Sequence, residues 1–233
     1  MFNLFKKKED REIKGNIVQP ASVRDTLFGN LSPDQWPMKN TGGHPWSMFV
    51  EARDQIIVTH NIEQAIKIYR QITETPGLES RHYLQAWHFL RKLKVQPPPE
   101  IAQKVYGVIV EVVVQAGAEL VVGYADHTAR NFHPSGSGTI WEAPNTSLNE
   151  KIDLLIQAGE EVAATVPTLK ENFRPDAPTK LDVAQICVLT PSGIHHGIGN
   201  AELFYKDKMA GRILNATTNL LQSLNELEKT NRK

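Results

Sequence analysis

Three consecutive prolines, Pro97 to Pro99, constrain this chain more than any other feature. Each proline fixes its own backbone and lacks an amide donor, so no helix runs through the group. Before the prolines, hydrophobic residues recur at helical spacing; after them, Val and Ile gather in the dense short runs typical of strands. The pattern predicts an extended or partly disordered leader over 1–45, a helical region over 46–96 and an α+β sheet domain over 100–233.

The helical region is expected to hold three helices. Ser47 is a candidate cap for the first, and Asn61, with Gln64 at the reciprocal position, for the second. The third is expected to begin near Ser80. Apolar residues of the second helix recur at the i, i+3, i+4 spacing of a helix with one buried side.

The part after the prolines reads as strands joined by short connections. The runs at 105–114, 119–126, 128–133, 139–142, 182–190 and 194–197 are extended, and Asp126-His127 suits a tight turn. Short connections require mainly antiparallel pairing. A helix with a Ser147–Glu150 capping box separates the runs, and a long helix from about Asn200 ends the chain. The fold class expected is α+β: an antiparallel sheet of about five strands packed with helices and preceded by a helical N-terminal region.

Composition excludes several classes of protein. Lys plus Arg and Asp plus Glu both number 26, so no net charge attracts the chain to nucleic acid, and no nucleic-acid partner is expected. The one cysteine, Cys187, precludes a disulfide within the chain and a cysteine-based zinc site. Its apolar neighbours predict a buried, inert thiol, which fits a reducing compartment.

No apolar stretch has the roughly 20 residues that a membrane span needs, so we expect a cytoplasmic protein without integral membrane association. The N-terminus places Phe2 and Phe5 before Lys6 to Lys8. This order is the reverse of a signal peptide, in which the charge comes first. It allows a small anchor on a membrane surface, or a charged tail that frays.

Polar residues near the strand ends are the best candidates for chemistry. The sequence has no phosphate-binding loop, no paired zinc histidines on a helix and no nucleophile elbow. If the sheet brought its turns together, one edge would gather an acid–base set of five candidate catalytic residues: Asp126, Arg130, His133, Glu142 and His195. The alternative is ordinary turn and surface structure. Because His195 and His196 are adjacent, a strand would direct them to opposite faces, and no metal or cofactor is predicted.

A second candidate is a binding face made by Tyr124, Arg130 and Trp141, since Trp and Arg are enriched where proteins bind partners. The alternative for Trp141 is a core position. Glu111 interrupts the apolar run 108–114; a strand with one solvated face would explain it, and a buried pairing is the other explanation.

Several short motifs resemble a family of uncharacterised bacterial cytoplasmic proteins. They are Tyr124-Ala125-Asp126 with Ala129-Arg130, Ser135-Gly136 through Trp141-Glu142, and Leu189-Thr190-Pro191-Ser192-Gly193. The resemblance covers about half of the chain, implies a bacterial cytoplasmic protein and implies no activity. The order of elements is also similar to roadblock and profilin-like modules, which serve as dimerisation and scaffold domains; no motif accompanies this topological similarity.

Together these features favour a non-enzymatic interaction or regulatory module with a protein partner or a second copy of itself. One alternative is a hydrolase, or a metal- or ligand-binding protein, that uses the edge from Asp126 to His195. Another is a membrane-surface adaptor that uses the N-terminal arm. The sequence leaves a small-molecule partner open.

Overall fold

The computed structural model describes residues 22–36, 43–170 and 173–231. Within these ranges, one six-stranded sheet has the order β4-β3-β2-β1-β5-β6, and all neighbouring strands are antiparallel. The strands are β1 (Gly107–Val114), β2 (Gly117–Tyr124), β3 (Ala129–Phe132), β4 (Gly138–Trp141), β5 (Val183–Thr190) and β6 (Gly193–Asn200). The predicted antiparallel α+β class is confirmed, with six strands where about five were expected.

The helices are η1 (Asp25–Leu27), α1 (Trp46–Ile57), α2 (Ile62–Glu74), α3 (Ser80–Lys92), α4 (Pro99–Ala102), α5 (Asn149–Thr165), α6 (Ala201–Lys206) and α7 (Lys208–Asn231). Asn61 caps α2 as predicted, accepting the amide of Gln64 at 3.1 Å. The predictions for Ser47 and Ser147 are wrong, because α1 and α5 begin without a side-chain cap.

The C-terminal helix predicted from about Asn200 is divided in two. Asn200 caps α6 by accepting the amide of Leu203 at 3.2 Å. Asp207 lies in an extended conformation between the two helices and accepts the amides of Met209 and Ala210. The carboxylate accepts two of the amides that the first turn of α7 leaves without a helical partner, so Asp207 both ends α6 and begins the long helix.

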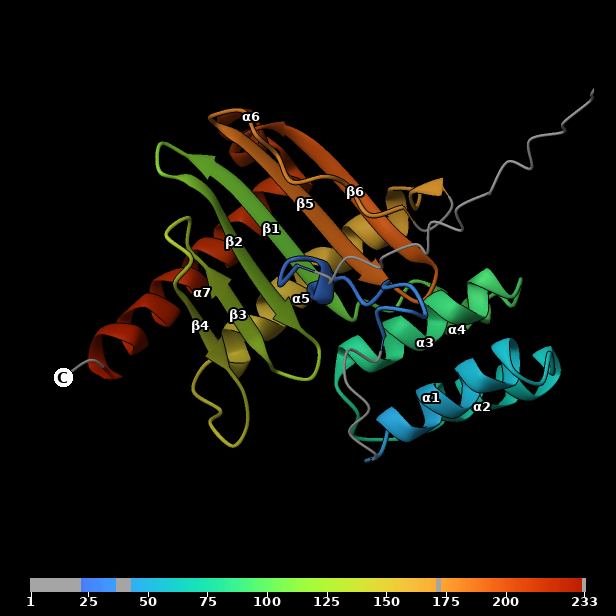
Figure 1. Cartoon of the computed structure of the whole chain (residues 1–233). Helices are drawn as coiled ribbons and strands as arrows, with labels where there is room; N and C mark the ends of the chain where they lie inside the picture. The colour runs from blue at the N-terminus through green and yellow to red at the C-terminus, as the bar shows by residue number, and fades with distance from the viewer. Residues whose placement is uncertain (1–21, 37–42, 171–172, 232–233) are drawn as a thin grey trace, which may run out of the picture.

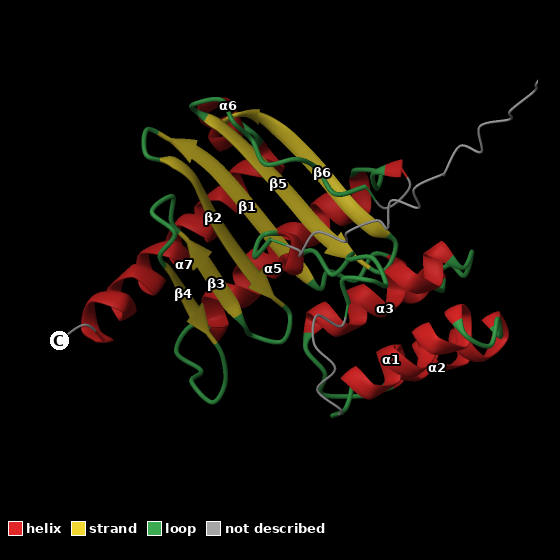
Figure 2. Ribbon diagram, viewed as in Figure 1, coloured by secondary structure: helices red, strands yellow, loops and turns green. Residues whose placement is uncertain are grey.

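Helices α5 and α7 cover one face of the sheet, called here the α5/α7 face (Figure 1). Alternation along β1 places Val108 and Val110 on this face. Gly159 allows α5 to approach closely, since a Cβ there would lie 2.9 Å from a methyl carbon of Val108. The apolar sides of the strands and of these helices thus pack together in one cluster. Figure 2 shows the two long helices crossing behind the strands.

The opposite face is covered in part by Leu27 and Phe28, from a segment that the sequence placed in the leader, and by Leu84 of α3. Tyr124 points to this side and donates its hydroxyl to the Leu27 carbonyl at 2.7 Å. Gly29 has φ +61°, and a Cβ there would lie 2.5 Å from Cβ of Leu84, so only glycine fits. Just beyond it, Gln85 exchanges two hydrogen bonds with the backbone of Leu31.

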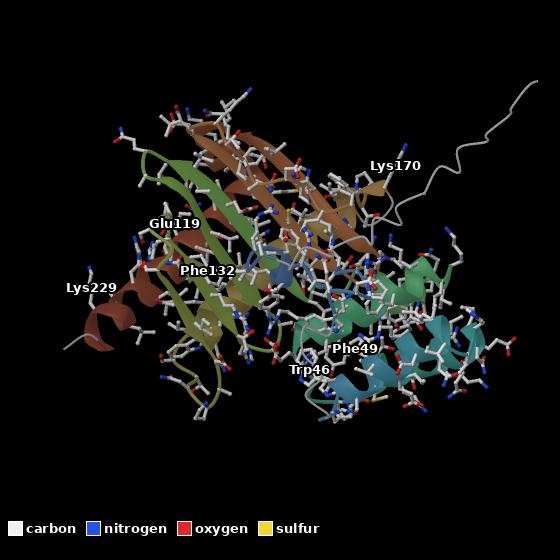
Figure 3. The ribbon with its side chains drawn as sticks, in the orientation of Figure 1. Trp46, Phe49, Glu119, Phe132, Lys170 and Lys229 are labelled. Atoms are coloured by element: carbon white, nitrogen blue, oxygen red, sulfur yellow. The ribbon has the colours of Figure 1, made fainter. Side chains whose placement is uncertain are left out.

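Helices α1, α2 and α3 form a separate apolar cluster beside the sheet (Figure 1). Trp46 and Phe49 lie among these helices, whereas Phe132 lies on the sheet (Figure 3). The sheet caps α3: the Asp126 carboxylate accepts the amide of Ser80 at 2.6 Å. None of the helices within the described ranges has the length and apolar character needed to cross a membrane. The proposed anchor at Phe2, Phe5 and Lys6 to Lys8 lies outside those ranges.

Candidate ligand cavity

The five candidate catalytic residues do not share a site. Both carboxylate oxygens of Asp126 accept structural hydrogen bonds. One accepts the Ser80 amide, and the other accepts the amide and hydroxyl of Thr128 at 3.0 and 2.7 Å. As predicted, the next residue, His127, takes the left-handed conformation of a tight turn, with φ +63°. Asp126 therefore fastens the β2–β3 turn to α3.

The other candidates are distributed over both faces. Arg130 pairs with Val122 on the face opposite α5 and α7, whereas His133 contacts Glu119 at 3.1 Å and Asn131 on the α5/α7 face. Glu142 follows β4 and is exposed. Because β2, β1 and β5 lie between β3 and β6, His195 on β6 is about 19 Å from β3 at the usual strand spacing. The expected convergence at one edge is absent.

His195 has a structural environment of its own. It is 3% exposed, with Nδ1 2.5 Å from the Val166 carbonyl and Nε2 3.2 Å from the Thr190 hydroxyl. A carbonyl only accepts, so Nδ1 carries the proton and donates. Burial lowers the pKa of His195, while the bond to Val166 opposes that shift. The ring therefore joins the end of α5 to β5 and β6 as a neutral group.

The predicted binding face of Tyr124, Arg130 and Trp141 does not form. Trp141 pairs with Ala129 and packs in the core on the α5/α7 face. Tyr124 is completely buried on the opposite face, where Arg130 also lies. The alternative reading of Trp141 as a core residue matches its position. Within the described ranges, no group of three His, Cys, Asp or Glu residues is placed to hold a metal ion.

A cavity of about 710 Å³ lies where residues 24–35, the helices α1, α2 and α3 and the segment 173–177 meet. Its volume is within the range of small-molecule sites. Apolar side chains form part of its lining: Ile56 of α1, Phe89 of α3, Leu93 directly after α3, and Phe173. Charged and polar side chains complete the wall.

A buried ion pair joins Arg24, in the wall of this cavity, to the sheet. Glu111, 2% exposed on β1, receives two hydrogen bonds from Arg24 at 2.6 and 2.7 Å and a third from Gln185 at 2.8 Å. Gln185 in turn contacts His196 of β6 at 3.1 Å, and Arg24 donates to the Pro175 carbonyl at 2.9 Å. Glu111 is therefore paired, and the expectation of a solvated strand face is wrong.

The segment 173–177 is tied to the N-terminal residues by a second ion pair. Arg174 contacts the Asp25 carboxylate at 3.2 Å and donates to Asn30 at 3.1 Å. The Phe28 ring lies near both arginines, 4.9 Å from the guanidinium of Arg24 and 5.9 Å from that of Arg174. Two arginines on one ring hold this wall in a fixed arrangement.

The helical side of the cavity holds two polar groups without a partner. The hydroxyl of Tyr69 and Nδ1 of His88 are shielded from solvent and make no hydrogen bond within the described ranges. Both side chains line the cavity. Burial, with the nearby charges of Arg91, Lys92 and Arg174, lowers the pKa of His88 to about 3, so its ring is neutral at pH 7. Burial likewise raises the pKa of Tyr69.

Sequence reasoning did not select these cavity residues. Tyr69 lies within the apolar stripe of α2, and Arg24 lies in the predicted leader. One signal was present: His88 follows Leu84 by four residues, so both occupy the same side of α3. A histidine on a buried helical face needs either a partner or a cavity.

No protein-family model, curated protein or solved structure matches the chain.

Proposed function

We propose that this chain is a binding protein that holds a small organic molecule in the cavity bounded by residues 24–35, the helices α1 to α3 and the segment 173–177. The observation that carries the proposal is the pair of buried polar groups without partners, on Tyr69 and His88, in the wall of a 710 Å³ cavity. Such groups each cost about 1–3 kcal/mol while unpaired. A bound molecule that supplies hydrogen-bonding groups would recover that cost.

The rest of the wall is suited to binding. Apolar side chains provide contact area, and the ion pairs Arg24–Glu111 and Arg174–Asp25 hold the polar side in place. Ligand sites combine apolar and aromatic contact area with positioned polar groups, and this wall provides both. The interaction or regulatory role expected from the sequence would then be one controlled by a ligand.

The test is the binding of an uncharged aromatic probe, 2-naphthol, followed by calorimetry. We expect a Kd below about 1 mM. Ala177→Trp, at an exposed position in the cavity wall, should weaken binding at least about tenfold by occupying the space. Thr179→Trp is the matched control, since Thr179 lies two residues further on and does not line this cavity. Equal loss in both variants, or no binding to the wild type, would refute the proposal.

A second candidate function, self-association, is favoured by the corner formed by β6 and α6. Ile198, Leu203 and Tyr205 are 52%, 65% and 47% exposed there, and an apolar cavity of about 360 Å³ opens beside Leu203. β6 carries neither lysine nor proline, the residues that usually protect an edge strand. Since the chain has no net charge, two copies would not repel each other.

Light scattering after size exclusion tests this candidate. We expect a dimer that becomes monomeric in Leu203→Asp, because a carboxylate in an apolar contact is costly. Leu154→Asp, at an exposed leucine of α5, is the control and should leave the dimer intact. A wild-type protein that stays monomeric at the highest attainable concentration would exclude self-association.

A further inference from the structure

The helical end of the cavity has a distinct chemistry. The Phe89 ring lies 5.1 Å from the ring of Tyr69 and 5.7 Å from that of His88, so both polar side chains border one aromatic surface. The Tyr69 hydroxyl can donate a hydrogen bond, and neutral His88 donates through whichever ring nitrogen carries its proton. This end of the cavity can therefore present two donors beside an apolar ring.

The charges that act on these two side chains are all cationic. Arg53 is the charged group that influences Tyr69, and Arg91, Lys92 and Arg174 influence His88. Asp25 and Asp176 are the carboxylates of the cavity wall; Asp25 is paired with Arg174, so these two charges offset each other, and Lys92 adds a cation to the wall. A site with donors in a positive environment stabilises an anion, which is recognised through charge-assisted hydrogen bonds.

The remaining lining indicates the body of the ligand. Phe89, Phe173, Ile56 and Leu93 provide apolar and aromatic contact area. Aromatic rings pack against one another in offset or edge-on arrangements, which favours a ring-containing ligand. Lys92, exposed in the wall of the cavity, adds a cation that reaches solvent and can attract an anion to the entrance.

We propose that the ligand is a small organic monocarboxylate with an aromatic body. Its carboxylate accepts hydrogen bonds from the Tyr69 hydroxyl and the His88 ring, near the ammonium of Lys92. Its ring lies against Phe89 and Phe173. This inference rests on the proposed ligand-binding function and adds the chemical class of the ligand.

The probes are 2-naphthoate and its uncharged isostere 2-naphthamide, titrated into the full chain by calorimetry. Hydrogen bonds to charged groups are roughly twice as strong as neutral ones, so we expect naphthoate to bind about tenfold more tightly. Tyr69→Phe should weaken naphthoate at least about fivefold and naphthamide less. Tyr205→Phe, whose hydroxyl contacts Thr218 on the surface, is the control and should change neither.

Lys92→Gln provides a second variant that leaves the interior intact. It should weaken naphthoate about threefold and leave naphthamide unchanged, whereas Lys67→Gln on the exposed side of α2 should affect neither. A bound anion should also raise the pKa of His88, followed through its ring protons by NMR, and naphthamide should not.

The outcomes separate the two proposals. Equal affinity for naphthoate and naphthamide, lost in Ala177→Trp, would overturn the carboxylate and keep the cavity as a ligand site. Naphthoate binding that is unchanged in both Tyr69→Phe and Lys92→Gln would place the anion elsewhere and also overturn the inference. Failure of both probes to bind below about 1 mM would overturn the carboxylate and the cavity together.

Discussion

The buried pair of Arg24 and Glu111 offers the sharpest test of how the N-terminal residues are held on the sheet. Arg24→Met keeps an unbranched apolar side chain and removes the guanidinium. Glu111 then keeps one hydrogen bond, from Gln185, in place of three. A carboxylate that is 2% exposed would lose its only charge partner within the described ranges.

Removing one partner of a buried ion pair costs about 3–5 kcal/mol. The Arg24 side chain remains 19% exposed, so water screens the pair in part, and we expect about 2–3 kcal/mol of lost unfolding free energy. The double variant Arg24→Met with Glu111→Leu removes both charges. It should be more stable than Arg24→Met alone, with a coupling energy of about 2 kcal/mol.

Urea unfolding followed by tryptophan fluorescence measures these differences, provided that the dependence on urea is unchanged. Arg212→Met is the matched control, because its pair with Glu161 at 3.0 Å is on the surface and should contribute less than about 0.5 kcal/mol. An Arg24→Met variant within about 0.5 kcal/mol of the wild type, or single effects that simply add in the double variant, would refute the reasoning.

Three further predictions concern the core and the cavity. Gly159→Ala should lower Tm, because the new Cβ would lie 2.9 Å from Val108 and overpacking of about 1–3 kcal/mol exceeds the gain of about 1 kcal/mol in helix propensity; a raised Tm would contradict this. His88 has a folded-state pKa of about 3 against 6.5 in the unfolded chain. The contribution of its neutral ring to the free energy of unfolding is therefore complete above pH 6.5 and is lost as pH falls toward 3. His88→Leu should therefore reduce the slope of stability against pH in urea titrations by up to about 1.4 kcal/mol per unit, and an unchanged slope would exclude a buried neutral ring. Cys187 is completely buried and its pKa is raised by burial, so a thiol reagent followed by absorbance should react with it only in denaturant.

Local features of the fold could be predicted because their causes are local. Runs of Val and Ile located the strands, helical spacing located α2 and α5, and Asp126-His127 located a turn that tolerates left-handed geometry. The failures have equally specific causes. Serine precedes many helices, and neither Ser47 nor Ser147 provides the cap at its helix. Asp207 was missed because one charged residue does not interrupt an apolar stripe.

The site could not be predicted because it depends on distant contacts. Arg24 and Glu111 are 87 positions apart, and no periodicity near either residue indicates the other. The strand register determines which face of the sheet each candidate residue occupies, since a shift by one residue would move Arg130 and Trp141 each to the opposite face. The order of the strands determines how far His195 lies from β3. Glu111 was the one residue whose position pointed to such a contact. A carboxylate within a run of valines requires a charged or hydrogen-bonding partner if both faces of the sheet are covered.

The segment 173–177 has a consequence beyond the cavity that it closes. Pro175, Asp176 and Ala177 line the 710 Å³ cavity and also a second cavity of about 530 Å³, which lies against Ile198 of β6. The same stretch of backbone is thus a wall of both cavities. Any molecule that displaces this segment on binding in one cavity alters the shape of the other cavity. By thermodynamic linkage, a ligand and a partner at the β6 edge would then change each other's affinity by the same factor.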